Sequence, residues 1–279
     1  MPDFGIFKGF NDKLFGDKLF AGQKPINLGS IDSDWYSYYQ RVLNAGGSLT
    51  TIEQAATLQL VKDLKSYSLW SKIQVLYPMV GASAAACRQN LISSSFTGTF
   101  TATGWTFAST GVTPNGTSAF LNTNYIPSLQ GTLNDAHFSI YLRSNISAST
   151  VDFGAYDGTN ETAIYPRHAN GSIYTAVNST TFPPLTTNNN SSGHFIATRI
   201  SSTIENTFIN TTKYSRTINS IGRPTVNLYV GANNNNGIAS NYSNRQNAFV
   251  SIGSSLSDTD ASNLYTTVQA FQTTLSRQV

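Results

Sequence analysis

Acidic residues are the first place to look for chemistry in this sequence, because hydrolysis of a sugar chain needs two carboxylates roughly 5–10 Å apart. The candidates between residues 96 and 255 are Asp135, Asp152, Asp157, Glu161 and Glu205. No two of them lie two residues apart on one predicted strand, where they would share a face of the sheet. Asp152 and Asp157 flank a turn and could still converge. A polysaccharide-degrading enzyme is therefore a remote alternative, and we do not predict an enzyme.

The same two aspartates, Asp152 and Asp157, are weak candidates for calcium ligands. With Asn160 and Glu161 they could supply oxygen ligands from one turn region. Asp157-Gly158 is also typical of a tight hairpin turn, and that interpretation is favoured. Cys87 is the only cysteine, which excludes an intrachain disulfide and a cysteine-based zinc site. We therefore predict no metal site and no cofactor.

Aromatic, amide and cationic side chains near two loops are suited to binding a sugar. An aromatic face packs against the apolar side of a sugar ring, and planar amides pair with its hydroxyl groups. The candidates for glycan contacts are Tyr165, Arg167, His168, Tyr242 and Arg245. The first three lie with Tyr174 near Asn170, and the last two follow an asparagine run at 233–236. The alternative is that each is an ordinary strand or loop residue.

The C-terminal segment is the best specified of the elements that must position these side chains. Residues 248–253 read as a strand, and a helix follows with Ser257 or Asp258 as its cap. Asp258 and Asp260 place negative charge in the first turn, where the helix dipole favours it. Apolar residues recur at three- and four-residue spacing: Ala261, Leu264, Tyr265, Val268, Phe271 and Leu275. We expect this helix to dock on apolar surface.

Two further helices are predicted before residue 75. The first begins at Asp32 or Ser33 and stops at Gly46-Gly47. The second begins with Thr50 and Glu53 at capping-box spacing.

From about residue 96 to 255 the pattern changes to short strands between turns. Regular spacing of this kind, without helical interruption, is typical of a β-sandwich or jelly roll. The predicted strands are 97–109, 118–122, 137–143, 151–156, 163–167, 172–177, 194–201, 205–210, 226–231 and 248–253.

Composition excludes several classes of partner. The net charge of +3 comes from Lys and Arg residues that form no cluster, so we predict no nucleic-acid binding. No window approaches the roughly 18 apolar residues of a membrane span. Residues 1–22 lack the continuous apolar run of a secretory signal, so we expect synthesis and folding in a cytoplasm.

Residues 1–31 form a glycine-rich arm with many aromatic residues. Five phenylalanines fall within its first twenty residues: Phe4, Phe7, Phe10, Phe15 and Phe20. These are too many to leave in water, and the segment holds too much glycine for a stable helix. We predict that the arm makes assembly contacts by inserting into a partner or a neighbouring subunit. The alternative is that it folds back on its own sandwich.

Three segments resemble a family of structural proteins from tailed phages and prophages. They are 69–81 (LWSKIQVLYPMVG) followed by 84–91 (AAACRQNL), 104–117 (GWTFASTGVTPNGT) and 252–275 (IGSSLSDTDASNLYTTVQAFQTTL). The family's C-terminal domain looks like a concanavalin A-like, or laminin-G-like, lectin and glucanase sandwich. The resemblance covers about residues 32–279 and leaves the arm outside it. It supplies an architecture and a context but no catalytic residues.

This resemblance implies a mainly β fold, a concanavalin A-like jelly-roll sandwich with an N-terminal arm, two N-terminal helices and a C-terminal helix. The expected parts are the anchoring arm at 1–31, a helical segment and linker at 32–95, and the sandwich with its helix at 96–279. The leading hypothesis is a structural component of a phage virion, such as a tail, fibre or baseplate protein. It would bind other virion proteins through the arm and form a homo-oligomer. The alternative hypothesis is a module that binds a host surface glycan or receptor.

Overall fold

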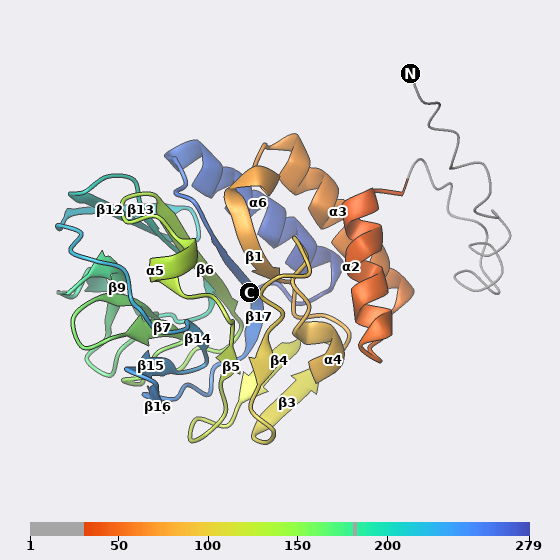
Figure 1. Cartoon of the computed structure of the whole chain (residues 1–279), viewed down its shortest axis with the longest axis horizontal. Coiled ribbons are helices and arrows are strands. Elements are labelled where there is room, and N and C mark those ends of the chain that lie inside the picture. Colours follow the sequence, from red (N-terminus) through yellow and green to blue (C-terminus); the bar gives the residue numbers. More distant parts are fainter. Residues whose placement is uncertain (1–30, 181–182) are drawn as a thin grey trace, which may run out of the picture. The chain divides into compact units, whose positions relative to one another are not determined.

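Two β-sheets packed face to face form the body of the computed structural model, which describes residues 31–180 and 183–279 (Figure 1). Residues Asp32–Val279 form one compact unit. The predicted arm contacts, from Phe4 to Phe20, lie outside the described residues.

Sheet A has eight strands in the described part of the chain, and every pairing in it is antiparallel. Its order is β13 (Thr212–Thr217), β12 (Ile204–Ile209), β11 (Gly193–Arg199), β6 (Ala136–Leu142), β17 (Asn247–Gly253), β4 (Gly111–Pro114) and β3 (Trp105–Ala108). The remaining strand, β1 (Ile73–Tyr77), also pairs with β17.

Sheet B has nine described strands. Its order is β10 (Thr186–Thr187), β9 (Ser172–Ser179), β8 (Glu161–Tyr165), β7 (Phe153–Tyr156), β14 (Tyr229–Val230), β5 (Leu121–Asn122) and β2 (Thr99–Phe100). A hairpin of β15 (Asn233–Asn235) and β16 (Ile238–Ser240) joins it through β7. Between the two sheets lies the apolar core, to which alternate residues of each strand contribute, for example Phe138 and Ile140 from β6 and Phe153 from β7.

Three long helices carry the capping residues that the sequence predicts. Asp32 accepts hydrogen bonds from the first turn of α2 (Ser33–Asn44), and Thr50 and Glu53 form a capping box at the start of α3 (Thr51–Ser66). A second capping box, between Ser257 and Asp260, begins α6 (Asp258–Thr274). Shorter helical turns are η1 (Trp70–Lys72), α4 (Ala84–Cys87) and α5 (Pro127–Gln130).

Helix α6 lies on the face of sheet A that points away from sheet B, next to α3 (Figure 1). The Tyr141 hydroxyl of β6 donates to Gln269 Oε1 of α6 at 3.1 Å, and the His194 ring of β11 stacks on Tyr265 with 6.5 Å between ring centroids. The predicted docking of this helix and the predicted fold class, a mainly β jelly-roll sandwich with N-terminal helices and a C-terminal helix, are confirmed.

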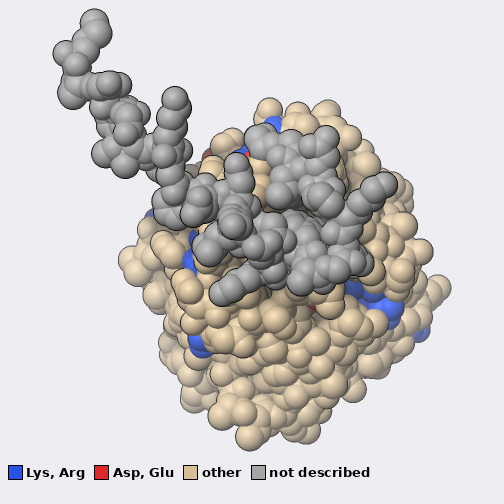
Figure 2. Space-filling view, turned by 90° about the vertical axis from the view of Figure 1, so that its right-hand side faces the viewer, with Lys and Arg blue, Asp and Glu red and all other residues tan. Residues whose placement is uncertain are grey.

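No helix of the described chain is long and apolar enough to cross a bilayer. Figure 2 shows one face of the molecule, on which the Lys and Arg side chains left visible stand in small separate groups among neutral residues.

Candidate functional site

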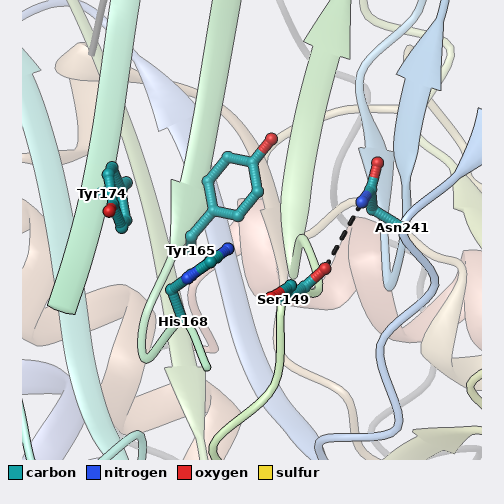
Figure 3. Close-up of a pocket in the computed structure, with 5 residues that line it drawn as sticks. All are labelled: Ser149, Tyr165, His168, Tyr174 and Asn241. Atoms are coloured by element: carbon teal, nitrogen blue, oxygen red, sulfur yellow. Dashed lines mark hydrogen bonds between the residues drawn. The ribbon is translucent and has the colours of Figure 1, made fainter. Parts of the chain in front are cut away.

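An open hollow of about 320 Å³ lies on the outer face of sheet B, beside the turn between β8 and β9 (Figure 3). Its lining residues are Ser149, Tyr165, His168, Tyr174 and Asn241. The strand register explains why the two tyrosines face outward: Tyr165 pairs with Tyr174, while their chain neighbours Ile164 and Ile173 belong to the core.

Three rings form one wall of this hollow. The Tyr165 and Tyr174 rings meet edge to face, with 6.3 Å between centroids and 68° between planes. The His168 ring meets Tyr174 in the same manner at 5.3 Å and 67°. Because edge-to-face pairs prefer these separations, the rings hold one another in place.

Hydrogen bonds within the β8–β9 turn hold the His168 and Tyr174 rings in position. The amide nitrogen of Gly171 donates to the His168 carbonyl at 2.8 Å, and Gly171 takes a positive φ of 79° that a glycine adopts without strain. Asn170 Nδ2 donates to the Tyr174 hydroxyl at 2.7 Å, and the Asn170 amide nitrogen donates to His168 Nδ1 at 3.4 Å. With Nδ1 accepting, the neutral His168 ring carries its proton on Nε2, which is a donor.

The opposite wall comes from two loops that the protein ties together. Asn241 Nδ2 donates to the Ser149 carbonyl at 3.4 Å, the dashed contact in Figure 3. The Val151 amide donates to the Asn241 carbonyl at 2.9 Å. The hydroxyl of Ser149 and the amide of Asn241 therefore stand opposite the rings and offer neutral donors and acceptors.

A buried ion pair supports both walls. Arg245 Nη1 lies 2.6 Å from Asp152 Oδ2, and both side chains are fully buried. The same guanidinium donates to the carbonyls of Ile146 and Arg167, and Ser243 Oγ donates to the free oxygen of Asp152 at 2.6 Å. Burial raises the pKa of Asp152, and Arg245 and Ser243 oppose that shift. This network joins the loop before β7 to the end of β8.

Of the five predicted glycan contacts, two line the hollow and three do not. Tyr165 and His168 line the hollow, together with Tyr174, which the sequence places near them. Arg167 Nη1 instead donates to Asn145 Oδ1 at 3.0 Å, and neither Arg167 nor Tyr242 is among the lining residues. The assignment of Arg245 as a glycan contact is wrong, because its side chain is buried beneath the loops and is bound to Asp152.

Both calcium candidates are already bonded to protein donors. Asp152 is occupied by Arg245 and Ser243. Asp157 Oδ1 accepts from the amides of Thr159 and Asn160, and its Oδ2 accepts from the Thr225 amide at 3.0 Å. Burial raises the pKa of Asp157, but these hydrogen bonds outweigh it and leave the pKa below its ordinary value. Within the described ranges, no group of three His, Cys, Asp or Glu could hold a metal ion.

Ser149, Asn241 and Glu161 are the residues of this region that the sequence does not assign to sugar contacts. The backbone of Asn241 is left-handed, with a φ of 48°. No sequence pattern predicts this conformation, which brings the side chain to the hollow. Glu161 lies next to Tyr165, whose hydroxyl donates to Glu161 Oε1 at 3.4 Å. Burial raises the pKa of Glu161 to about 7.

No protein-family model matches this sequence, and no curated protein matches it. Solved structures match at the level of the fold. Domain 4 of AbnA, an extracellular GH43 arabinanase from Geobacillus stearothermophilus in complex with arabinotriose, is 12% identical with a TM-score of 0.47; the match covers 70% of this chain and 98% of that one. The binding domain of botulinum neurotoxin serotype D is 10% identical with a TM-score of 0.47, over 71% of this chain and 52% of that one.

A third match is the Trypanosoma rangeli sialidase in complex with sialic acid, 7% identical with a TM-score of 0.47 over 75% of this chain. This chain covers 38% of the sialidase's length, so the match concerns one part of that protein. The similarity to all three is distant and is one of chain arrangement. It does not bear on the phage resemblance of the sequence, which stays a prediction.

Proposed function

We propose that this sandwich is a carbohydrate-binding module and that the hollow beside β8 and β9 holds the sugar. One observation carries the proposal: three rings, with Tyr174 packed against the other two, stand opposite a hydroxyl and an amide in one open hollow. Rings stack on the apolar face of a sugar, while neutral hydroxyl and amide groups pair with its hydroxyls. The volume of about 320 Å³ is at the small end of ligand sites, which suits a short stretch of a glycan.

We further propose that the module binds the sugar without cleaving it. Cleavage by the usual mechanism needs two carboxyl groups that flank one bond. Asp152 is held by Arg245, and Asp157 is held by its own turn and by Thr225. The carboxyl group of Glu161 contacts the lining residue Tyr165. Incubation with any glycan that binds should release no new reducing ends.

Binding is tested with a glycan array followed by titration calorimetry of the best sugar. Replacing Tyr174 by Ala removes the central ring of the wall and should weaken binding at least roughly tenfold. Tyr67→Ala is the matched control, because Tyr67 is an exposed tyrosine at the end of α3 and should leave affinity unchanged. Equal affinity of Tyr174→Ala and wild type would place the sugar elsewhere, and no binding across the array would reject the function.

The setting that we propose for this module is a phage virion, with the protein as a homo-oligomer. The support is the sequence resemblance at 69–81, 104–117 and 252–275. The test is deletion of residues 1–31, which should leave a folded sandwich that no longer enters particles. Normal incorporation of the shortened chain would reject the anchoring role.

A further inference from the structure

Glu161 contacts the aromatic wall at the hydroxyl end of Tyr165. It begins β8 four residues before Tyr165, and the two-residue period of a strand puts both side chains on the outer face of sheet B. The Tyr165 hydroxyl donates to Glu161 Oε1 at 3.4 Å. Glu161 is only 5% exposed, so the carboxyl group is shielded from water on most sides.

Among the described residues, the lining of the hollow consists of neutral side chains apart from the His168 ring. Ser149, Tyr165, Tyr174 and Asn241 carry no charge at neutral pH. The nearby guanidinium groups of Arg167 and Arg245 are bonded to protein acceptors. None of the ion pairs among the described residues involves Glu161. Its negative charge is therefore not neutralised by a cation on these elements.

Given the proposed function, on which this step rests, we infer that Glu161 makes the hollow selective for neutral sugars and against sugars that carry a carboxylate. An ionised Glu161 repels a second carboxylate across a poorly hydrated ring, where charge interactions are stronger than in water. The Tyr165 hydroxyl donates to Glu161 Oε1, so in this arrangement it does not offer its proton to a ligand carboxylate.

The test compares matched sugars on one array: glucose and galactose trisaccharides against glucuronic and galacturonic acid trisaccharides. At pH 8.5 the wild-type protein should bind the neutral member of a pair at least roughly tenfold tighter. Glu161→Gln keeps the shape and removes the charge, so it should bring the two affinities to within about threefold by strengthening the acidic sugar. Asp63→Asn on α3 removes the same charge far along the sequence from this site and should keep the discrimination.

A pH series on the wild-type protein gives a second readout that needs no variant. The titratable groups on the elements around Glu161 are Tyr165 on β8, Tyr156 opposite on β7 and Asp157 in the turn; β9 contributes Ser179, which does not titrate. Because burial raises the pKa of Glu161 to about 7, its charge is lost between pH 8.5 and 5.5. Acidic sugars should then bind more tightly at pH 5.5.

His168 also lines the hollow, so the same series is run on Glu161→Gln. The part of the pH dependence of acidic-sugar affinity that is lost in this variant is due to Glu161. If no sugar binds the wild-type protein, the proposed function fails. If neutral and acidic sugars bind equally, or acidic ones bind better at pH 8.5, only the selectivity of Glu161 is overturned. A Glu161→Gln protein with wild-type melting behaviour but unchanged discrimination overturns it too.

Discussion

At the scale of single residues, Asp152 and Arg245 show how a polar pair can shape a site without touching its ligand. The pair is fully buried, and its guanidinium also holds the carbonyls of Ile146 and Arg167. A buried pair of this kind adds little to stability against an apolar replacement, but removing one partner leaves an uncompensated charge. The arrangement therefore fixes the geometry of the loops around the hollow.

Asp152→Asn should lower the free energy of unfolding by about 3–5 kcal/mol, because Arg245 would remain buried without a counter-charge. Urea denaturation measures this directly. The matched control is Lys213→Gln, which breaks the exposed pair between Lys213 Nζ and Asp258 Oδ1, 2.7 Å apart; it should change stability by less than about 1 kcal/mol. Similar losses for the two variants would contradict a structural role for the buried pair.

At the scale of elements, α6 closes the outer face of sheet A. Phe271 is 3% exposed, and the Arg277 guanidinium lies 5.2 Å from the centre of its ring. Arg277 itself is buried and donates to the carbonyls of Pro78, Met79 and Ala248. The end of the helix is thus bonded both to the loop after β1 and to β17.

Phe271→Asp should destabilise the protein by several kcal/mol, since it removes a buried ring together with its contact to Arg277 and buries a carboxylate among apolar residues. Thermal unfolding is the measurement. Thr266→Asp, on the exposed face of the same helix, is the control and should leave the melting temperature nearly unchanged. An unaltered melting temperature for Phe271→Asp would show that the helix is not needed to cover sheet A.

Elements whose signals are local could be predicted from the sequence. The capping box at Thr50, the cap at Ser257 and the apolar spacing of α6 depend on residues within a few turns, and the structure confirms them. The predicted strand 97–109 is wrong in its continuity: it divides into β2 in sheet B and β3 in sheet A, with Gly104 at a φ of 87° between them. Alternation of polar and apolar residues is the same in both sheets, so it does not show where the chain passes from sheet B to sheet A.

The candidate site was harder to predict for the same reason. Tyr165, His168 and Tyr174 are close in sequence, so one hairpin brings them together. Asn241 and Ser149 are distant from these residues in the sequence, and only the tertiary fold brings them to the hollow. Arg245 binds Asp152, which lies 93 positions away in the sequence. Sequence spacing therefore does not distinguish this buried arginine from an arginine that faces a ligand.

At the scale of the whole molecule, two histidines and two serines form a buried chain between sheet A and the helices. His137 Nε2 lies 3.0 Å from Ser251 Oγ, which lies 2.7 Å from Ser139 Oγ, and His194 Nε2 lies 3.2 Å from Ser139 Oγ. His194 Nδ1 has no hydrogen-bond partner among the described residues. Burial lowers the pKa of His137 to about 4 and that of His194 to about 3, from an ordinary value of 6.5.

These histidines should make the fold sensitive to mild acid. In the unfolded chain both take up protons as the pH falls below 6.5, whereas in the folded protein they stay neutral until the pH nears 4 and 3. The contribution of these histidines to the free energy of unfolding is therefore fully present above pH 6.5 and falls as the pH drops, by about 2 kcal/mol for each histidine at pH 5.

Urea midpoints measured from pH 7.5 to 5 give the slope of stability against pH. His194→Gln should reduce it by roughly half, because one of the two buried rings is then absent. A midpoint that does not move between pH 7.5 and 5 would mean that both buried rings accept protons without loss of packing.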